Sequence, residues 1–259
     1  RVTAHSLVDT TEPPPPPLTP DGRPPREQVR ERLRYRAGGG WGAAAEFTFP
    51  ADYVPRHDDF VAYARPSFTP GTPVLVVAQD LMQRIFKDFT YESLSTDVST
   101  PAVEALAQRK GVCQDFAHIM IACMRAMGLP ARYVSGYLLT MPPEGQPRLI
   151  GSDASHAWAS VYVPQPAGAG ASALAGDVDT SGWFDFDPTN NRSPGEDYVT
   201  LAIGRDYGDV SPMRGVIHGG ARHTLQVGVT VEPVEAPAVR GQSQSQSQSQ
   251  GQSQSQSQN

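Results

Sequence analysis

The first long hydrophobic pattern in the chain has the period of a helix. Over residues 74–91 the apolar positions recur at close to helical spacing, and they are Val74, Val77, Ala78, Leu81, Ile85 and Phe89. A second helix is predicted downstream, with Thr100 as its cap and Pro101 as its first residue, because proline suits the first turn of a helix. This helix should end at Gly111.

A third helix is expected to follow at once. One stripe along it is apolar and consists of Phe116, Met120, Cys123, Met124 and Met127. Gly128 can adopt the left-handed conformation that ends a helix, and Pro130 cannot continue one. The third helix should therefore stop just before these two residues.

Beyond this helix the hydrophobic pattern changes to a period of two, which is typical of strands. Strands are predicted over residues 132–139, 155–163, 183–187 and 225–231. A group of helices followed by a run of strands indicates an α+β fold, with the helices packed on an antiparallel β-sheet.

The two ends of the chain have a different composition. Residues 1–10 predict one short strand, and the prolines at 13–17 should form polyproline II. The simpler interpretation of these prolines is a stiff spacer, and the alternative is a ligand for an SH3-type domain. Residues 13–40 are predicted to be a linker with a charged segment, and residues 41–235 a globular core. The Gln/Ser repeat within residues 236–259 has no apolar residue to bury and is predicted to be disordered.

Charge and composition exclude several classes of protein. The 259 residues include 21 Lys and Arg against 27 Asp and Glu, a net charge of −6, which argues against nucleic-acid binding. Two cysteines cannot form a disulfide framework, and their spacing is not that of a zinc site. No apolar run approaches the ~20 residues that span a bilayer. We expect a soluble, cytoplasmic protein with no membrane partner, and the start at Arg1 without a leader sequence suggests a fragment or a processed product.

Cys113 is the candidate nucleophile. It lies where the third predicted helix begins, and the unpaired N–H groups and the helix dipole at that end favour a thiolate. Cys123 lies on the apolar stripe of the same helix, so we expect it to be an unreactive core residue.

A nucleophilic cysteine needs a base, and His156 is the best placed of the six histidines. It begins a predicted strand and shares one face of it with Trp158 and Tyr162. His118 is excluded, because five residues along a helix rotate it by about 140° from Cys113.

The residue that orients the base should be a carboxylate near the end of a neighbouring strand. Asp187 ends the strand predicted over residues 183–187 and is the first choice. Asp185 on the same strand is the alternative acid, and Asp153 is a more distant third.

Three of these segments together resemble the core motifs of the transglutaminase-like superfamily, most closely its bacterial members. They are residues 111–117 (GVCQDFA), 155–158 (SHAW) and 183–190 (WFDFDPTN), and residues 202–215 resemble the segment that follows the last motif. The resemblance extends over about residues 60–230 and implies a papain-like transglutaminase core. By resemblance Cys113 is the nucleophile, His156 the base and Asp187 the orienting acid. A β-sandwich-like domain usually precedes this core, and residues 1–12 would then be the last strand of that domain.

The resemblance implies acyl transfer through a thioester. The substrate would be a protein or peptide with glutamine or other amide groups, and the acceptor an amine or water. The backbone N–H of Cys113 should stabilise the oxyanion. Eukaryotic members add an upstream tryptophan, which this chain lacks between Trp41 and Cys113; Tyr91 or Gln108 could substitute for it.

Calcium, which eukaryotic members use, is not expected here. Residues 177–182 (DVDTSG) imitate the first half of an EF-hand loop, but Pro188 occupies the position that requires a glutamate. We therefore predict no metal and no cofactor. The alternative to an enzyme is a catalytically silent protein-interaction module that keeps the fold.

Overall fold

The computed structural model describes residues 3–18, 24–34, 42–93, 95–140, 155–164, 182–211, 219 and 228–234. Its α-helices are α1 (Arg26–Arg32), α2 (Asp58–Ala64), α3 (Val74–Asp88), α4 (Ala102–Gln108), α5 (Cys113–Ala126) and α6 (Tyr207–Val210), and the 3-10 helices are η1 (Ala43–Thr48) and η2 (Arg65–Ser67). The strands are β1 (Thr90–Tyr91), β2 (Lys110–Gly111), β3 (Ala131–Leu138), β4 (Ser155–Tyr162), β5 (Trp183–Phe186) and β6 (Tyr198–Gly204).

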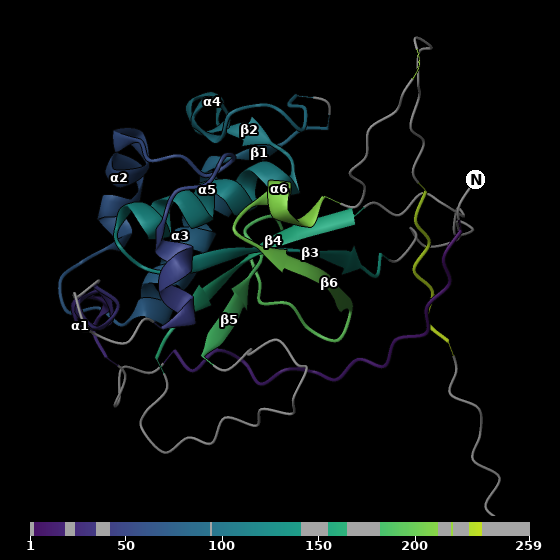
Figure 1. Cartoon of the computed structure of the whole chain (residues 1–259), viewed down its shortest axis with the longest axis horizontal. Coiled ribbons are helices and arrows are strands. Elements are labelled where there is room, and N and C mark those ends of the chain that lie inside the picture. The colour runs from purple at the N-terminus through teal and green to yellow at the C-terminus, as the bar shows by residue number, and fades with distance from the viewer. Residues whose placement is uncertain are drawn as a thin grey trace, which may run out of the picture.

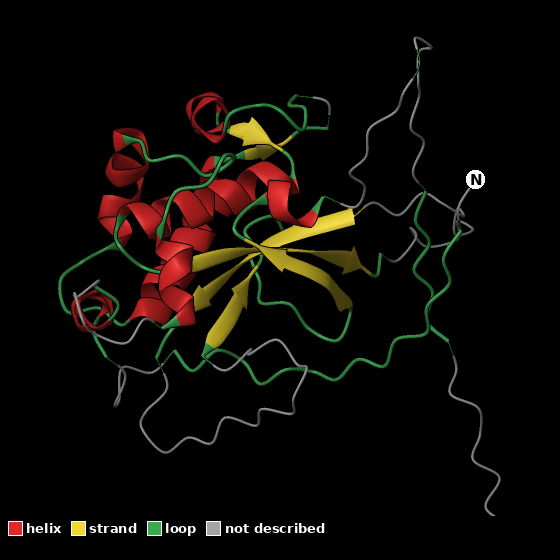
Figure 2. Ribbon diagram, in the orientation of Figure 1, coloured by secondary structure: helices red, strands yellow, loops and turns green. Residues whose placement is uncertain are grey.

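Four of these strands form an antiparallel sheet in the order β5-β4-β3-β6, while β1 and β2 form a small parallel pair. The larger helices gather on one side of the sheet (Figure 1). Figure 2 shows the same separation between helices and strands. The predicted α+β fold, with helices packed on an antiparallel sheet, is confirmed.

Helix α5 is the centre of this arrangement. Every residue from Asp115 to Arg125 is buried, and the helix packs against β3 and β4 on one side and against α2, α3 and α4 on the other. The guanidinium of Arg125 donates to backbone oxygens of Phe49, Ala131 and Arg205. These bonds satisfy a buried charge, and they fix the C-terminal end of α5 against β3 and the segment after β6.

Several predicted helix boundaries are corrected by the structure. Helix α3 ends at Asp88 rather than near Tyr91, because Thr90 and Tyr91 form β1. Pro101 is the cap of α4 and not its first residue, with an extended ψ of 135°. Helix α4 ends at Gln108, before the predicted Gly111, because Arg109 takes the left-handed conformation and the chain turns into β2.

The strand predictions succeed in the middle of the chain and fail towards its ends. Strands β3, β4 and β5 lie within one residue of their predicted bounds. Strand β6 was not predicted, although it pairs with β3 along most of its length. Residues 3–10 form no strand, and the described part of the predicted strand 225–231, residues 228–231, holds only an isolated bridge.

The N-terminal region is more closely associated with the core than a linker would be. Helix α1 lies within the segment predicted to be a linker, and its Val29 is fully buried in the core. Leu18 also packs against the core. Residues 10–16, with the sheet face that the helices leave uncovered, line a cavity of about 890 Å³. The N-terminal segment, purple in Figure 1, runs past that side of the sheet.

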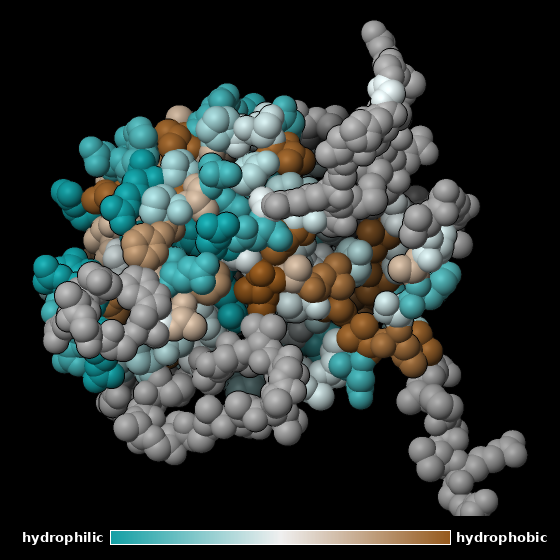
Figure 3. Space-filling model, viewed as in Figure 1, coloured by the Kyte–Doolittle hydropathy of each residue, from teal (hydrophilic) through white to brown (hydrophobic). Residues whose placement is uncertain are grey.

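The surface of the helical side differs from that of the sheet side. In the view of Figure 3, hydrophilic residues cover much of the helical side, whereas hydrophobic ones gather towards the sheet and the N-terminal segment. Large exposed hydrophobic residues include Leu7, Val8, Leu201 and Val234. Among the described residues, none of the helices combines the length and the apolar character needed to cross a membrane.

A shorter side chain in the middle of α5 tests the structural role of this helix. Met120 is fully buried in the core, so Met120→Ala should lower the free energy of unfolding by about 2–5 kcal/mol in a denaturant titration. Cys113→Ala, at the half-buried start of the same helix, should change it little. Comparable losses from the two substitutions would contradict the assignment of Met120 to the core and of Cys113 to a reactive position.

Candidate active site

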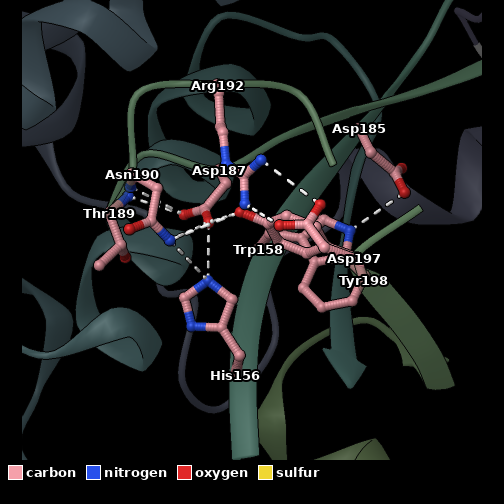
Figure 4. A network of polar contacts seen from close by, with 9 residues as sticks. All are labelled: His156, Trp158, Asp185, Asp187, Thr189, Asn190, Arg192, Asp197 and Tyr198. Carbon is pink, nitrogen blue, oxygen red and sulfur yellow. Dashed lines mark hydrogen bonds and ion pairs between the residues drawn. The ribbon is translucent and has the colours of Figure 1, made fainter. Parts of the chain in front are cut away.

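His156 and Asp187 form a buried pair at the edge where β4 begins and β5 ends. The His156 Nε2 atom lies 2.7 Å from Asp187 Oδ2 (Figure 4). His156 is 9% exposed and Asp187 is fully buried. Because β4 and β5 are antiparallel neighbours, the start of one strand lies beside the end of the other, as the pairing of two strand-terminal residues requires.

The Asp187 carboxylate accepts hydrogen bonds from several other groups. Oδ1 accepts from the backbone N–H groups of Thr189 and Asn190, at 2.8 and 3.3 Å. Oδ2 accepts from Asn190 Nδ2 and from the Tyr198 hydroxyl, each at 2.7 Å. Burial raises the pKa of Asp187, but the bonds from His156, Tyr198 and Asn190 outweigh burial and hold that pKa below its usual value. Asp187 is therefore ionised in the folded protein.

Cys113 is the first residue of α5, and the turn before it is fixed by Asp115. The Asp115 Oδ2 atom accepts from the backbone N–H of Val112 at 2.8 Å and from the Thr96 hydroxyl at 2.6 Å. Gly111 makes this close packing possible, because a Cβ atom there would lie 2.6 Å from that same oxygen. The thiol is thus presented, half-buried, at a helix terminus whose start is held by a buried carboxylate.

Cys113 is the second side chain, after Asp187, that raises the pKa of His156. Nε2 faces Asp187 and lies 3.4 Å from Asn190 Nδ2, which leaves Nδ1 for an interaction with Cys113. Burial alone lowers the pKa of His156, but hydrogen bonds and charges from Asp187 and Cys113 together raise it to about 9. At neutral pH the imidazole is then protonated, with the Asp187 carboxylate as its partner.

Asp185, the alternative acid proposed from the sequence, has a different partner. Asp185 accepts a hydrogen bond from the indole of Trp158 at 3.0 Å instead of pairing with His156. Trp158 in turn lies beside His156, with 6.1 Å between the ring centroids. Asp153 lies outside the described residues.

The two proposed oxyanion donors have different surroundings. Tyr91 lies on β1, which pairs with β2 just before Cys113, and this residue is 54% exposed. Burial, followed by the proximity of Cys113, raises the pKa of Tyr91, so its hydroxyl keeps its proton. Gln108, by contrast, donates to Glu104 on the exposed side of α4, where its amide is engaged away from the site.

Cys123 is a core residue, as the sequence predicts, and His118, which the sequence excludes as the base, is buried too. His118 accepts from the backbone N–H of Tyr207 at 3.2 Å and stacks on Tyr53. Burial, followed by the charge of Arg125, lowers the pKa of His118 to about 3, so this ring is neutral. Cys123 is fully buried, and burial raises the pKa of its thiol.

Two residues of the site have no counterpart in the sequence predictions. Asn190 lies in the motif of residues 183–190 without a predicted role of its own, and Tyr198 lies in β6, which the sequence predictions lack. Residues 198–203 (YVTLAI) are rich in β-branched and aromatic residues, and this composition is the strand signal that could have found Tyr198. A partner for Asp187 on that strand follows only when β6 is placed in the sheet.

The described residues offer no evident metal site. They contain no group of three or more His, Cys, Asp or Glu side chains that could hold an ion. Most of the EF-hand-like segment 177–182 lies outside the described residues.

Comparisons with known proteins agree with this architecture. The sequence model of the Transglutaminase-like superfamily matches residues 62–188. An uncharacterized protein of Mycobacterium tuberculosis is 44% identical over 239 residues, which cover 92% of this chain and 71% of that protein. A protein-glutamine gamma-glutamyltransferase of Pseudomonas aeruginosa is 27% identical over 124 residues, 45% of this chain and 16% of that enzyme.

One solved structure has the same fold. It is a candidate cysteine protease from Cytophaga hutchinsonii, with a TM-score of 0.51 and 26% sequence identity. The match covers 73% of this chain, which spans about half (55%) of the length of that protein.

The protonation of His156 can be measured directly. In a ring-nitrogen NMR titration, His156 should keep its second proton until the pH approaches 9. Asp187→Asn removes the negative charge that favours the imidazolium and should move this pKa downward. His118 is the internal control and should stay neutral throughout. An unshifted His156, titrating near pH 6.5 in the unaltered protein, would contradict the coupling to Asp187 and Cys113.

Proposed function

Because the chain belongs to the transglutaminase-like superfamily, we propose that it is a cysteine enzyme that transfers the acyl group of a protein or peptide amide through a thioester. The observation that supports this most directly is the placement of His156. Its Nε2 atom is held by Asp187, and an interaction with Cys113 contributes to the raised pKa of the ring. This order of thiol, imidazole and carboxylate is what nucleophilic catalysis by cysteine requires.

In the first half of the reaction, the Cys113 thiolate attacks the carbonyl carbon of the amide. A carbon–sulfur bond forms, and the carbonyl oxygen becomes an oxyanion. The first N–H groups of a helix have no partner four residues earlier, so the Cys113 N–H is available to stabilise that oxygen. We assign the nearby hydroxyl of Tyr91 as a second donor. His156 then gives its proton to the departing nitrogen, which leaves as ammonia or an amine.

In the second half, an amine or water attacks the thioester carbonyl. Neutral His156 takes the proton of this nucleophile, the carbon–sulfur bond breaks, and Cys113 leaves as the thiolate beside the imidazolium. An amine acceptor gives a cross-link, whereas water gives deamidation or hydrolysis. The glutamyltransferase and the candidate protease among the similar proteins are named for these two kinds of outcome.

The reactivity of the thiol tests the proposal without a known substrate. At pH 7, iodoacetamide should modify Cys113 much faster than the buried Cys123, as followed by mass spectrometry of the two peptides. His156→Ala should slow the labelling of Cys113 by about 10²-fold or more. Equal and slow labelling of both cysteines would favour a catalytically silent interaction module.

A model substrate separates the two reaction outcomes. A glutamine-containing protein is incubated with the enzyme, with and without a labelled primary amine, and both ammonia release and amine incorporation are measured. Transfer predicts incorporation of the label, and hydrolysis predicts ammonia or new termini without it. Either activity should fall by about 10²–10⁴-fold in Asp187→Asn, which keeps the shape of the side chain but loses its charge. An activity that persists in Cys113→Ala would exclude the thioester route.

A further inference from the structure

Tyr198 contacts the same carboxylate oxygen as the imidazole of the site. Its hydroxyl lies 2.7 Å from Asp187 Oδ2, and His156 Nε2 lies 2.7 Å from that oxygen too. Tyr198 comes from β6, which pairs with β3 and not with β4 or β5. A residue from the far edge strand of the sheet thus contacts the acid that directly follows β5 (Figure 4).

We propose that Tyr198 is a positioning residue for the acyl-transfer reaction: its hydroxyl fixes the Asp187 carboxylate in the orientation that holds His156 towards Cys113. The inference rests on the proposed function, because it assigns Tyr198 a part in the same reaction.

The first support is the number of donors around Asp187. His156, Asn190 and Tyr198 all lie 2.7 Å from Oδ2, while two backbone N–H groups face Oδ1. An ionised carboxylate has about four acceptor positions, so these donors leave it little freedom to rotate. With Oδ2 fixed, the Nε2 end of the imidazole is fixed, and so is the direction in which Nδ1 points.

The second support is that the phenol itself is immobilised. Tyr198 is only 6% exposed, and its ring packs edge-on against Trp158 at a centroid distance of 5.4 Å. The guanidinium of Arg192 lies 4.8 Å from the centre of the Tyr198 ring and forms an ion pair with Asp197. The ring is therefore held between an indole and a cation that is itself anchored.

The third support is electrostatic. Burial and the adjacent charge of Asp187 raise the pKa of Tyr198, so its hydroxyl remains protonated and acts as a donor. Donors to the ionised form of a carboxylate hold its pKa down. Tyr198 thus helps Asp187 to keep its charge, and the proton stays on His156.

Replacement by phenylalanine separates this role from packing. Tyr198→Phe retains the ring between Trp158 and Arg192 and removes only the hydroxyl. Tyr162→Phe is the matched control, because Tyr162 lies at the other end of β4 and packs against Trp183. Both variants, and the unaltered protein, are assayed for iodoacetamide labelling of Cys113 across pH and for turnover of a glutamine-containing protein.

In Tyr198→Phe, labelling of Cys113 and kcat should each fall roughly tenfold, while KM changes by less than about twofold. The loss of a donor raises the pKa of Asp187. The fall in the labelling rate at low pH, which is the acid limb of its pH profile, should therefore move to higher pH by about half a unit or more. A purely structural role would leave that limb in place. Tyr162→Phe should match the unaltered protein in both assays.

The outcomes distinguish the two proposals. Slow labelling of Cys113 in the unaltered protein overturns the proposed function, whatever Tyr198 does. Fast labelling that Tyr198→Phe leaves unchanged in rate and pH dependence overturns the role of Tyr198 alone.

If Tyr198→Phe does not fold, Arg192→Gln keeps the hydroxyl but loosens the ring, and it should shift the acid limb in the same direction by a smaller amount. An unshifted limb in that variant would equally contradict the inference.

Discussion

Asp187 is a charged group without contact with solvent, and its solvation has to come from the protein. An isolated buried carboxylate is strongly unfavourable, so the fold must bring donors to it from several directions. The strand order β5-β4-β3-β6 does this: β4 supplies His156, the turn after β5 supplies Asn190, and β6 supplies Tyr198. The same donors that stabilise the carboxylate also orient the imidazole, so the stability and the chemistry of the site depend on one set of hydrogen bonds.

The other half of the site depends on how α5 begins. The helix is buried along almost its whole length, so the position of its first residue is set by the core rather than by the surface. Asp115 then fixes the preceding turn through Val112 and Thr96, and Gly111 leaves the room that this contact needs. The sulfur is placed by a rigid element while remaining only half-buried, an arrangement that suits the nucleophile proposed above.

The sequence best predicts the elements whose local hydrophobic pattern matches the surface that the fold buries. The apolar stripe of α5 and the alternation in β3, β4 and β5 each describe a surface that is buried in the fold, and these elements were predicted within a residue or so. Residues 109–111 show the opposite case. They carry no strong pattern of their own, and they leave the helix because β2 pairs with β1, a contact between segments about 20 residues apart. Pairing of that kind cannot be seen in a local window.

Choosing between Asp185 and Asp187 shows the same limit within the site. Both acids point to the sheet face that carries His156, and the alternation of strand residues treats them alike. Their roles diverge because Trp158, two residues after His156 on β4, reaches Asp185 with its indole N–H, whereas Asp187 lies beyond the last paired residue of β5 and meets the imidazole. Strand register, rather than residue type, decides which acid becomes the partner of His156. Asp185 still contributes, since it anchors an indole that lies against both His156 and Tyr198.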